Sequence, residues 1–332
     1  MATGAIRLLA EHYGEQDTTL VVKPEIAPLA QREFPKAGVI PVANSSKRKK
    51  GNAFAGFVRF VPSLRRLRQL HYEAAVCLRP RRNSMQTLLF AAARAGRHIA
   101  AENVFVREGG LRRKVIENLL CSAIGPELVP YPSERKSLSL ELEAHRSVVS
   151  RALGREVGAE EILPRIESAR WIGSQGWLVC PFSSRTMKDY SAELWLESFL
   201  SVSDVLPSRI RLAGGPDQIE RLRSFASVLG TAIRKCAVEV LPCKPLNHFP
   251  DLVAEADLVL TVDTAAAHFA CAIDVPAVIV DSGNNPGVYG PYGRPERQVW
   301  LTGDRKKFGR LRWRETVPPS LVAAAIRRAL AA

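Results

Sequence analysis

Short runs of apolar and β-branched residues alternate along this chain with longer segments of helical period, and this alternation constrains the fold more than any other feature. Each run is typical of a short buried strand. The runs occupy residues 18–22, 38–42, 73–78, 176–182, 208–215, 237–242, 257–262 and 276–280. Strands that alternate with helices form parallel sheets through βαβ connections. The sequence therefore predicts an α/β fold.

The segments between these runs place apolar residues three and four positions apart, as an amphipathic helix does. The clearest examples are residues 84–96, 191–206 and 217–235. Residues 318–332 predict a terminal helix with Val322, Ile326 and Leu330 on one face. Each of these helices is long enough to cover one face of a sheet.

The chain has 332 residues, and a typical domain size of roughly 150 residues predicts two domains. Residues 154–176 carry few strand signals, so we expect the boundary there, between domains of residues 1–165 and 166–332. No stretch reaches the roughly 18 consecutive apolar residues of a membrane helix, and the first residues do not have the pattern of a secretory leader. We therefore expect a cytoplasmic protein.

Basic residues exceed acidic ones, with 47 Lys and Arg against 33 Asp and Glu and a net charge of +14. Such a surface attracts anions, whether nucleic acid, phosphorylated small molecules or an anionic membrane face. Basic runs lie at residues 45–51, 63–70 and 78–83. The cysteines show neither a CxxC pair nor a nearby histidine at ligand spacing, so we predict reduced thiols and no metal site.

One stretch joins a predicted strand to a helix that begins with polar residues. The strand at 257–262 is followed by Asp263 and Thr264, and His268 lies one turn into the helix. Open α/β sheets bind ligands at the carboxyl ends of their strands, and free amides in the first turn of a helix suit a phosphate. The small alanines at 265–267 leave that approach open. The plainer alternative is a capped helix with a packed histidine.

A second loop of this kind follows the strand at 176–182. It carries Ser183, Ser184 and Arg185, and Lys188 precedes the next helix. Two hydroxyls, a guanidinium and an ammonium at the end of a strand are expected to bind an anion. A polar turn before a capped helix is again the plainer alternative.

Two glycine-rich loops follow further strands of the same predicted domain. Gly214 and Gly215 permit close approach of the backbone, and Asp217 or Glu220 would accept hydrogen bonds from ribose hydroxyls. Residues 281–293 form a loop rich in Gly, Pro and Asn. Four loops at one edge of a sheet indicate a ligand of nucleotide size.

In this order, these motifs resemble those of glycosyltransferase family 9, the heptosyltransferase-like enzymes of lipopolysaccharide synthesis. The matching pieces are PFSSRTMK, RLAGGPDQIERLR, ADLVLTVDTAAAHFACAIDVPAVIV and GPYG. The resemblance implies a GT-B fold, with two Rossmann-like parallel-sheet domains facing a cleft and the nucleotide sugar on the C-terminal half. The last helix would be free to pack back on the N-terminal domain.

The resemblance also implies a set of donor-binding residues. They are Ser183, Ser184, Lys188, Glu220, Asp263, Thr264, Ala265 and His268. Lys188 would hold the pyrophosphate with the two serines and the helix amides, while Glu220 or Asp217 would bind the ribose. Asp263 would bind sugar hydroxyls, and the Thr264 and Ala265 amides would bind a phosphate, with His268 supporting them. Such enzymes use no metal or other cofactor, and they invert the anomeric carbon with the help of a carboxylate base.

The chain departs from the family pattern at its beginning. The family opens with a strand and a glycine-aspartate loop that carries the base, whereas MATGAIRLLAEHY resembles the helix that follows. We therefore expect an N-terminal domain without its first strand, and the catalytic and acceptor-binding residues stay unassigned. Ala265 replaces a family glycine, and KDYS replaces K-x-W-P, so the fit of the donor is expected to differ.

The leading hypothesis is a glycosyltransferase that moves a sugar to an anionic glycolipid acceptor. The expected sugar is heptose, and the expected donor is ADP-heptose. Its basic runs would then face acceptor phosphates and the inner membrane. The alternative is a non-catalytic nucleotide-sugar-binding or scaffold protein that has lost the base. Nucleic-acid binding ranks last, because the basic runs lack interleaved aromatic residues and show no known nucleic-acid motif.

Overall fold

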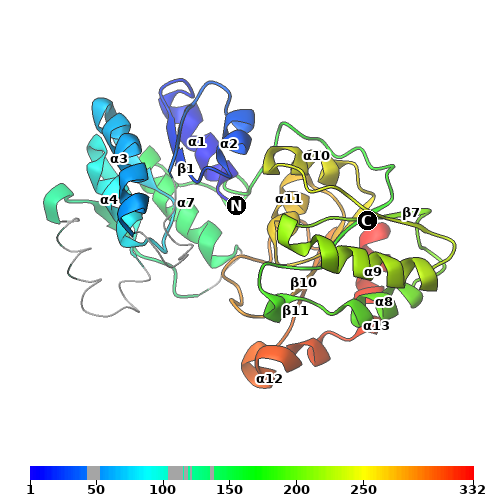
Figure 1. Cartoon of the computed structure of the whole chain (residues 1–332). Helices are drawn as coiled ribbons and strands as arrows, with labels where there is room; N and C mark the ends of the chain where they lie inside the picture. The colour runs from blue at the N-terminus through cyan, green and yellow to red at the C-terminus, as the bar shows by residue number, and fades with distance from the viewer. Residues whose placement is uncertain (43–52, 104–114, 116–118, 120–121, 135–137) are drawn as a thin grey trace. The chain divides into compact units, whose positions relative to one another are not determined.

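The computed structural model describes the chain except for residues 43–52, 104–114, 116–118, 120–121 and 135–137. The described residues divide into two compact units (Figure 1). One comprises Ala2–Leu163, and the other comprises Met1 and Pro164–Ala332. We call them the N-terminal unit and the C-terminal unit. The basic run at 45–51 lies outside the described residues.

The C-terminal unit is built on a six-stranded parallel sheet of order β11-β10-β9-β6-β7-β8. Its strands are β6 (Trp177–Cys180), β7 (Arg209–Leu212), β8 (Ala237–Val240), β9 (Leu258–Val262), β10 (Ala277–Asp281) and β11 (Gln298–Thr302). Every residue of β6, β9 and β10 is buried. Burial of this kind is expected where helices cover both faces of a parallel sheet.

The helices of this unit connect the strands and cover the sheet. They are α8 (Ala192–Leu200), α9 (Ile219–Ala232), α10 (Phe249–Ala254), α11 (Ala265–Ile273), α12 (Arg305–Arg312) and α13 (Pro319–Leu330). The 3-10 turns are η1 (Thr186–Lys188), η2 (Pro216–Gln218), η3 (Leu246–His248) and η4 (Trp313–Thr316). The last helix, α13, packs against α8 and β10 of its own unit, as Figure 1 shows for the red and green helices. Large aromatic side chains, including Trp195 and Trp313, fill the core.

The N-terminal unit has two parallel sheets within its described residues. One pairs β1 (Thr19–Val22) with β2 (Gly38–Pro41), and the other has the order β3 (His71–Cys77), β4 (Arg94–Ala101), β5 (Glu127–Val129). The helices are α1 (Thr3–Tyr13), α2 (Ala27–Glu33), α3 (Ala53–Gln69), α4 (Ser84–Ala92) and α7 (Leu140–Leu153). Helix α7 packs on α1 and on the second sheet.

The predicted α/β class is confirmed, and each of the eight predicted strands has a counterpart. Sequence reasoning missed β4, β5 and β11. Residues 94–96 were expected to end a helix, but they begin β4 and pair with β3. In β4, basic residues and small residues replace the β-branched run that signals a strand, so only pairing with β3 identifies it. Within the described residues, no helix combines the length and apolar character needed to cross a membrane.

Candidate functional site

A hollow of about 610 Å³ opens at the carboxyl edge of the C-terminal sheet. The four predicted loops all contribute to its wall, together with the loop after β8. Six of the eight residues expected to bind the donor line it: Ser183, Ser184, Lys188, Asp263, Thr264 and Ala265. The loops converge because all six strands are parallel, so their carboxyl ends share one edge.

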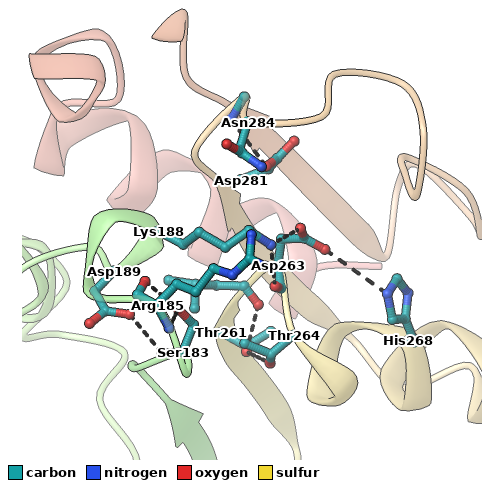
Figure 2. A network of polar contacts seen from close by, with 12 residues as sticks. Ser183, Arg185, Lys188, Asp189, Thr261, Asp263, Thr264, His268, Asp281 and Asn284 are labelled. Atoms are coloured by element: carbon teal, nitrogen blue, oxygen red, sulfur yellow. Dashed lines mark hydrogen bonds and ion pairs between the residues drawn. The ribbon is translucent and has the colours of Figure 1, made fainter. Parts of the chain in front are cut away.

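Lys188 and Asp263 form the charged centre of this hollow (Figure 2). The Lys188 ammonium lies 2.6 Å from Oδ2 of Asp263 and donates a second hydrogen bond to the Asp263 carbonyl at 3.3 Å. The two side chains are only 16% and 10% exposed. An ammonium has three donors, so one remains for a ligand. Turn η1 thereby brings a cation to the end of β9, where the helix begins.

Helix α11 presents its N-terminus to the same hollow. Its N-cap, Thr264, is extended and makes no side-chain cap bond, because its Oγ1 lies 3.1 Å from Oγ1 of Thr261. The amides of the first turn therefore remain free of intrahelical and capping partners. Ala265 and Ala266 line the hollow, so only methyl groups flank these amides. This combination suits a phosphate group.

The hydrogen bonds of Ser183 stabilise its own loop. Its hydroxyl donates to the Arg185 carbonyl at 2.7 Å and accepts from the Arg185 amide at 3.0 Å. Its own amide donates to Oδ1 of Asp189 at 2.6 Å, and Asp189 also pairs with Arg221. Ser184 is exposed and lines the hollow, so its hydroxyl is the one that a ligand would meet.

His268 lies on the side of Asp263 opposite Lys188 (Figure 2), and it is not part of the wall of the hollow. Its Nε2 is 4.0 Å from Oδ1 of Asp263, and its Nδ1 is hydrogen-bonded to the Tyr292 hydroxyl at 2.8 Å. Burial lowers the pKa of His268 to about 3, so the imidazole is neutral near pH 7. A neutral His268 adds no positive charge to the site.

Glu220 does not reach the hollow. Its side chain is 84% exposed and pairs with Arg223 at 2.6 Å. Asp217 is exposed as well and is not part of the wall. The third loop instead contributes Gln218, whose Oε1 accepts from the Gly215 amide at 3.1 Å. Sequence reasoning missed this glutamine because it favoured the charged acceptors beside it.

Asp281 is a second carboxyl group close to the Lys188–Asp263 pair (Figure 2). It ends β10, is 8% exposed and accepts a hydrogen bond from the Gly283 amide at 3.1 Å. Burial, reinforced by the Asp263 carboxylate, raises the pKa of Asp281 to about 6. Its place at the carboxyl end of a parallel strand was a signal that sequence reasoning could have used. The carboxyl groups of Asp263 and Asp281 therefore both lie near the Lys188 ammonium.

The loop after β8 supplies the less polar side of the hollow. Leu246 and Phe249 line it, together with Cys243 and Lys244. An apolar wall of this kind accommodates a planar ring. No group of three or more His, Cys, Asp or Glu side chains in the described part of the chain is arranged to hold a metal ion.

Comparisons with known proteins agree with this geometry. Residues 143–315 match the family described as glycosyltransferase family 9 (heptosyltransferase). Lipopolysaccharide heptosyltransferase 1 from Escherichia coli strain K12 is 34% identical over 113 residues, which cover 34% of this chain and 33% of that protein. The match thus spans about a third of the length of this curated relative.

Two solved structures show the same fold. The E. coli heptosyltransferase WaaC with ADP has a TM-score of 0.69 at 19% identity, over 99% of this chain and 97% of that chain. The E. coli ADP-heptose lps heptosyltransferase II has a TM-score of 0.66 at 14% identity, over 99% of this chain and 94% of that chain. The predicted GT-B class, with two parallel-sheet domains, is confirmed by this likeness.

Proposed function

Because this chain belongs to glycosyltransferase family 9, we propose that it transfers a sugar from a nucleoside-diphosphate donor to an acceptor of the lipopolysaccharide-core type. The observation that carries this proposal is the Lys188 ammonium beside Asp263 at the open N-terminus of α11. A cation and free amides that converge on one hollow are suited to a diphosphate. The volume of about 610 Å³ is of the size that nucleotide-like ligands occupy.

Each part of the hollow takes one part of the donor in this proposal. The diphosphate lies between Lys188 and the first-turn amides of α11. The nucleobase lies against Leu246 and Phe249, and the ribose lies near Gln218. A hydroxyl group of the transferred sugar donates a hydrogen bond to the Asp263 carboxylate. Structures of the similar E. coli heptosyltransferase WaaC contain ADP or ADP-2-deoxy-2-fluoro heptose, and this supports ADP-heptose as the donor.

The proposed reaction inverts the anomeric carbon without a metal. An acceptor hydroxyl oxygen bonds to that carbon while its bond to the diphosphate oxygen breaks, and a carboxylate base takes the hydroxyl proton. Lys188 and the amides of α11 stabilise the charge that develops on the leaving diphosphate. Removing one such preorganised donor typically lowers a rate by about 100- to 1000-fold.

The proposed acceptor is an anionic glycolipid, reached from the cytoplasmic side of the inner membrane. In the N-terminal unit, Arg65, Arg66 and Arg68 are exposed at the end of α3. Basic residues near an anionic surface each contribute about 1 kcal/mol to association. Their exposure supports a peripheral contact of this kind.

Calorimetric titration with ADP, followed by a transfer assay with ADP-heptose and a heptose-free core glycolipid, tests the proposal. We expect saturable ADP binding. Lys188→Met should weaken it, because Lys188 lines the hollow, and Glu220→Gln should leave it unchanged, because Glu220 does not. Transfer of heptose to the glycolipid would support the proposed activity. Folded protein that binds no nucleoside diphosphate would refute the donor site. ADP binding without transfer to any acceptor would favour a non-catalytic binding protein.

A further inference from the structure

Turn η1 carries Lys188 and is held by a side chain from a distant part of the chain. Arg314, in η4, donates from Nε to the Asp189 carbonyl at 2.6 Å and from Nη2 to the Thr186 carbonyl at 3.2 Å. Thr186 begins the turn, and Asp189 directly follows it. The guanidinium thus bonds to both ends of the turn at once, in a forked geometry that a lysine side chain does not provide.

Turn η1 is short, so its own hydrogen bonds hold it weakly. It has three residues, and no side chain caps its N-terminus. The Lys188 amide donates to the Arg185 carbonyl at 2.8 Å. The Asp189 amide donates to the Thr186 carbonyl at 3.1 Å. Bonds of this 3-10 type have poorer geometry than those of an α-helix. The place of the turn therefore depends on contacts from outside it.

The turn determines where the Lys188 ammonium lies. This ammonium is 2.6 Å from Oδ2 of Asp263, which follows β9 and precedes α11. A lysine charge sits on a flexible four-carbon stem, so it is fixed only as well as its backbone and its partner are fixed. A displaced turn would carry the ammonium away from the first-turn amides of α11. A diphosphate that needs both would then bind more weakly.

Two other side chains hold the same turn and have further contacts. The Trp313 indole donates to the Met187 carbonyl at 3.1 Å, but its ring is fully buried in the core. Nη2 of Arg305 lies 3.6 Å from Sδ of Met187, while its Nη1 donates to the Asn284 side chain. Replacing Trp313 would disturb the core, and replacing Arg305 would disturb the loop after β10. Arg314 is only half-buried and bonds to the turn, so it is the residue whose replacement tests the turn.

We propose that Arg314 is a positioning residue of the donor site, which holds turn η1 and through it the Lys188 ammonium. The proposal rests on the proposed function, because it takes Lys188 as the cation that binds the diphosphate. Arg314 is not part of the wall of the hollow. Its effect on a ligand therefore passes through the turn, and it should vanish when the Lys188 ammonium is removed.

Calorimetric titration of ADP into variants of the full chain tests this role. Arg314→Met should weaken ADP binding by roughly fivefold or more, because both bonds to the turn are lost. Arg314→Lys keeps the charge without the fork and should weaken binding by roughly threefold or more. Arg312→Met is the matched control, since the Arg312 side chain is 70% exposed and pairs with Glu315 of its own segment. ADP affinity should be unchanged in this control.

A double-mutant cycle with Lys188→Met separates positioning from a general loss of stability. In the Lys188→Met background, Arg314→Met should leave ADP affinity unchanged, because the ammonium that it positions is gone. A general loss of stability would instead weaken ADP binding equally in both backgrounds. Urea unfolding gives the folded fraction of each variant. Arg314→Lys takes the place of Arg314→Met in the cycle where the methionine variant does not fold.

The outcomes distinguish this role from the proposed function. Wild-type protein that binds no ADP would refute the donor site itself, and the role of Arg314 with it. Weakened binding in Lys188→Met, with wild-type affinity in Arg314→Met, would overturn the role of Arg314 alone. An equal loss in both backgrounds of the cycle would also overturn it. So would wild-type affinity in Arg314→Lys, because charge without the fork would then be enough.

Discussion

The Lys188 ammonium and the Asp263 carboxylate lie 2.6 Å apart although 75 residues separate them in the chain. The pair joins turn η1 to the end of β9, and it lies beside the N-terminus of α11. It is largely withdrawn from solvent, so each charge depends on the other. The pair therefore holds the two loops together and also sets the charge that a ligand meets.

Lys188→Met should weaken ADP binding by about 10- to 100-fold, because a charged hydrogen bond contributes about 1.5–3 kcal/mol. The same change leaves Asp263 buried without its cation, so the free energy of unfolding should fall by up to about 3 kcal/mol. Calorimetry and urea unfolding measure the two effects. Unchanged ADP affinity in the folded variant would remove Lys188 from the donor site.

Asp263→Asn should separate nucleotide binding from sugar transfer. Lys188 keeps its charge in this variant and loses its buried partner, so ADP should bind as tightly as before or more tightly. Heptose transfer should fall at least tenfold, because the proposed contact to the sugar hydroxyl is lost. A titration with ADP beside a transfer assay provides the comparison. Equal losses in both measurements would contradict the assigned role.

Gln218→Ala should weaken ADP binding several-fold, whereas Glu220→Gln should not change it. Gln218 lines the hollow and holds the Gly215 amide, but Glu220 points to solvent beside Arg223. The two side chains are neighbours in sequence and of similar size, which makes each the control for the other. A larger effect at Glu220 would restore the ribose contact that the motif alone suggests.

His268 should make the protein less stable in mild acid. Its folded pKa of about 3 lies below the ordinary value of 6.5, so its contribution is complete above pH 6.5 and is lost as the pH falls toward 3. From pH 8 to pH 5 this loss amounts to about 2 kcal/mol. Urea unfolding of the wild type and of His268→Gln at both pH values isolates the effect. Parallel pH profiles for the two proteins would contradict it.

Glu141 should act in the opposite direction. Its folded pKa of about 7 lies above the ordinary 4.5, so stability is lost as the pH rises between these values, by on the order of 3 kcal/mol. Glu141→Gln should abolish that loss and be the more stable protein at pH 8. Unfolding curves at pH 4.5 and pH 8 provide the measurement. The prediction fails if the variant and the wild type lose stability equally.

Apart from β11, the C-terminal half of the fold follows from sequence pattern, because its signals are local. Buried strands such as β9 and β10 are continuous apolar runs, and polar residues mark the point where each one ends. The edge of the sheet that binds ligands follows from parallel order alone. Strand β4 escaped prediction because its sequence is polar and small, and its strand state depends on pairing with β3.

By itself, the sequence determined the α/β class, the approximate positions of eight strands and four of the loops that meet at the hollow, because hydrophobic periodicity and chain order decide these. Only the tertiary structure decided which side chains of those loops are used. Gln218 turns inward while Glu220 turns out, and His268 loses its charge by burial. Side-chain direction and desolvation depend on neighbours distant in the chain, and a local motif does not contain them.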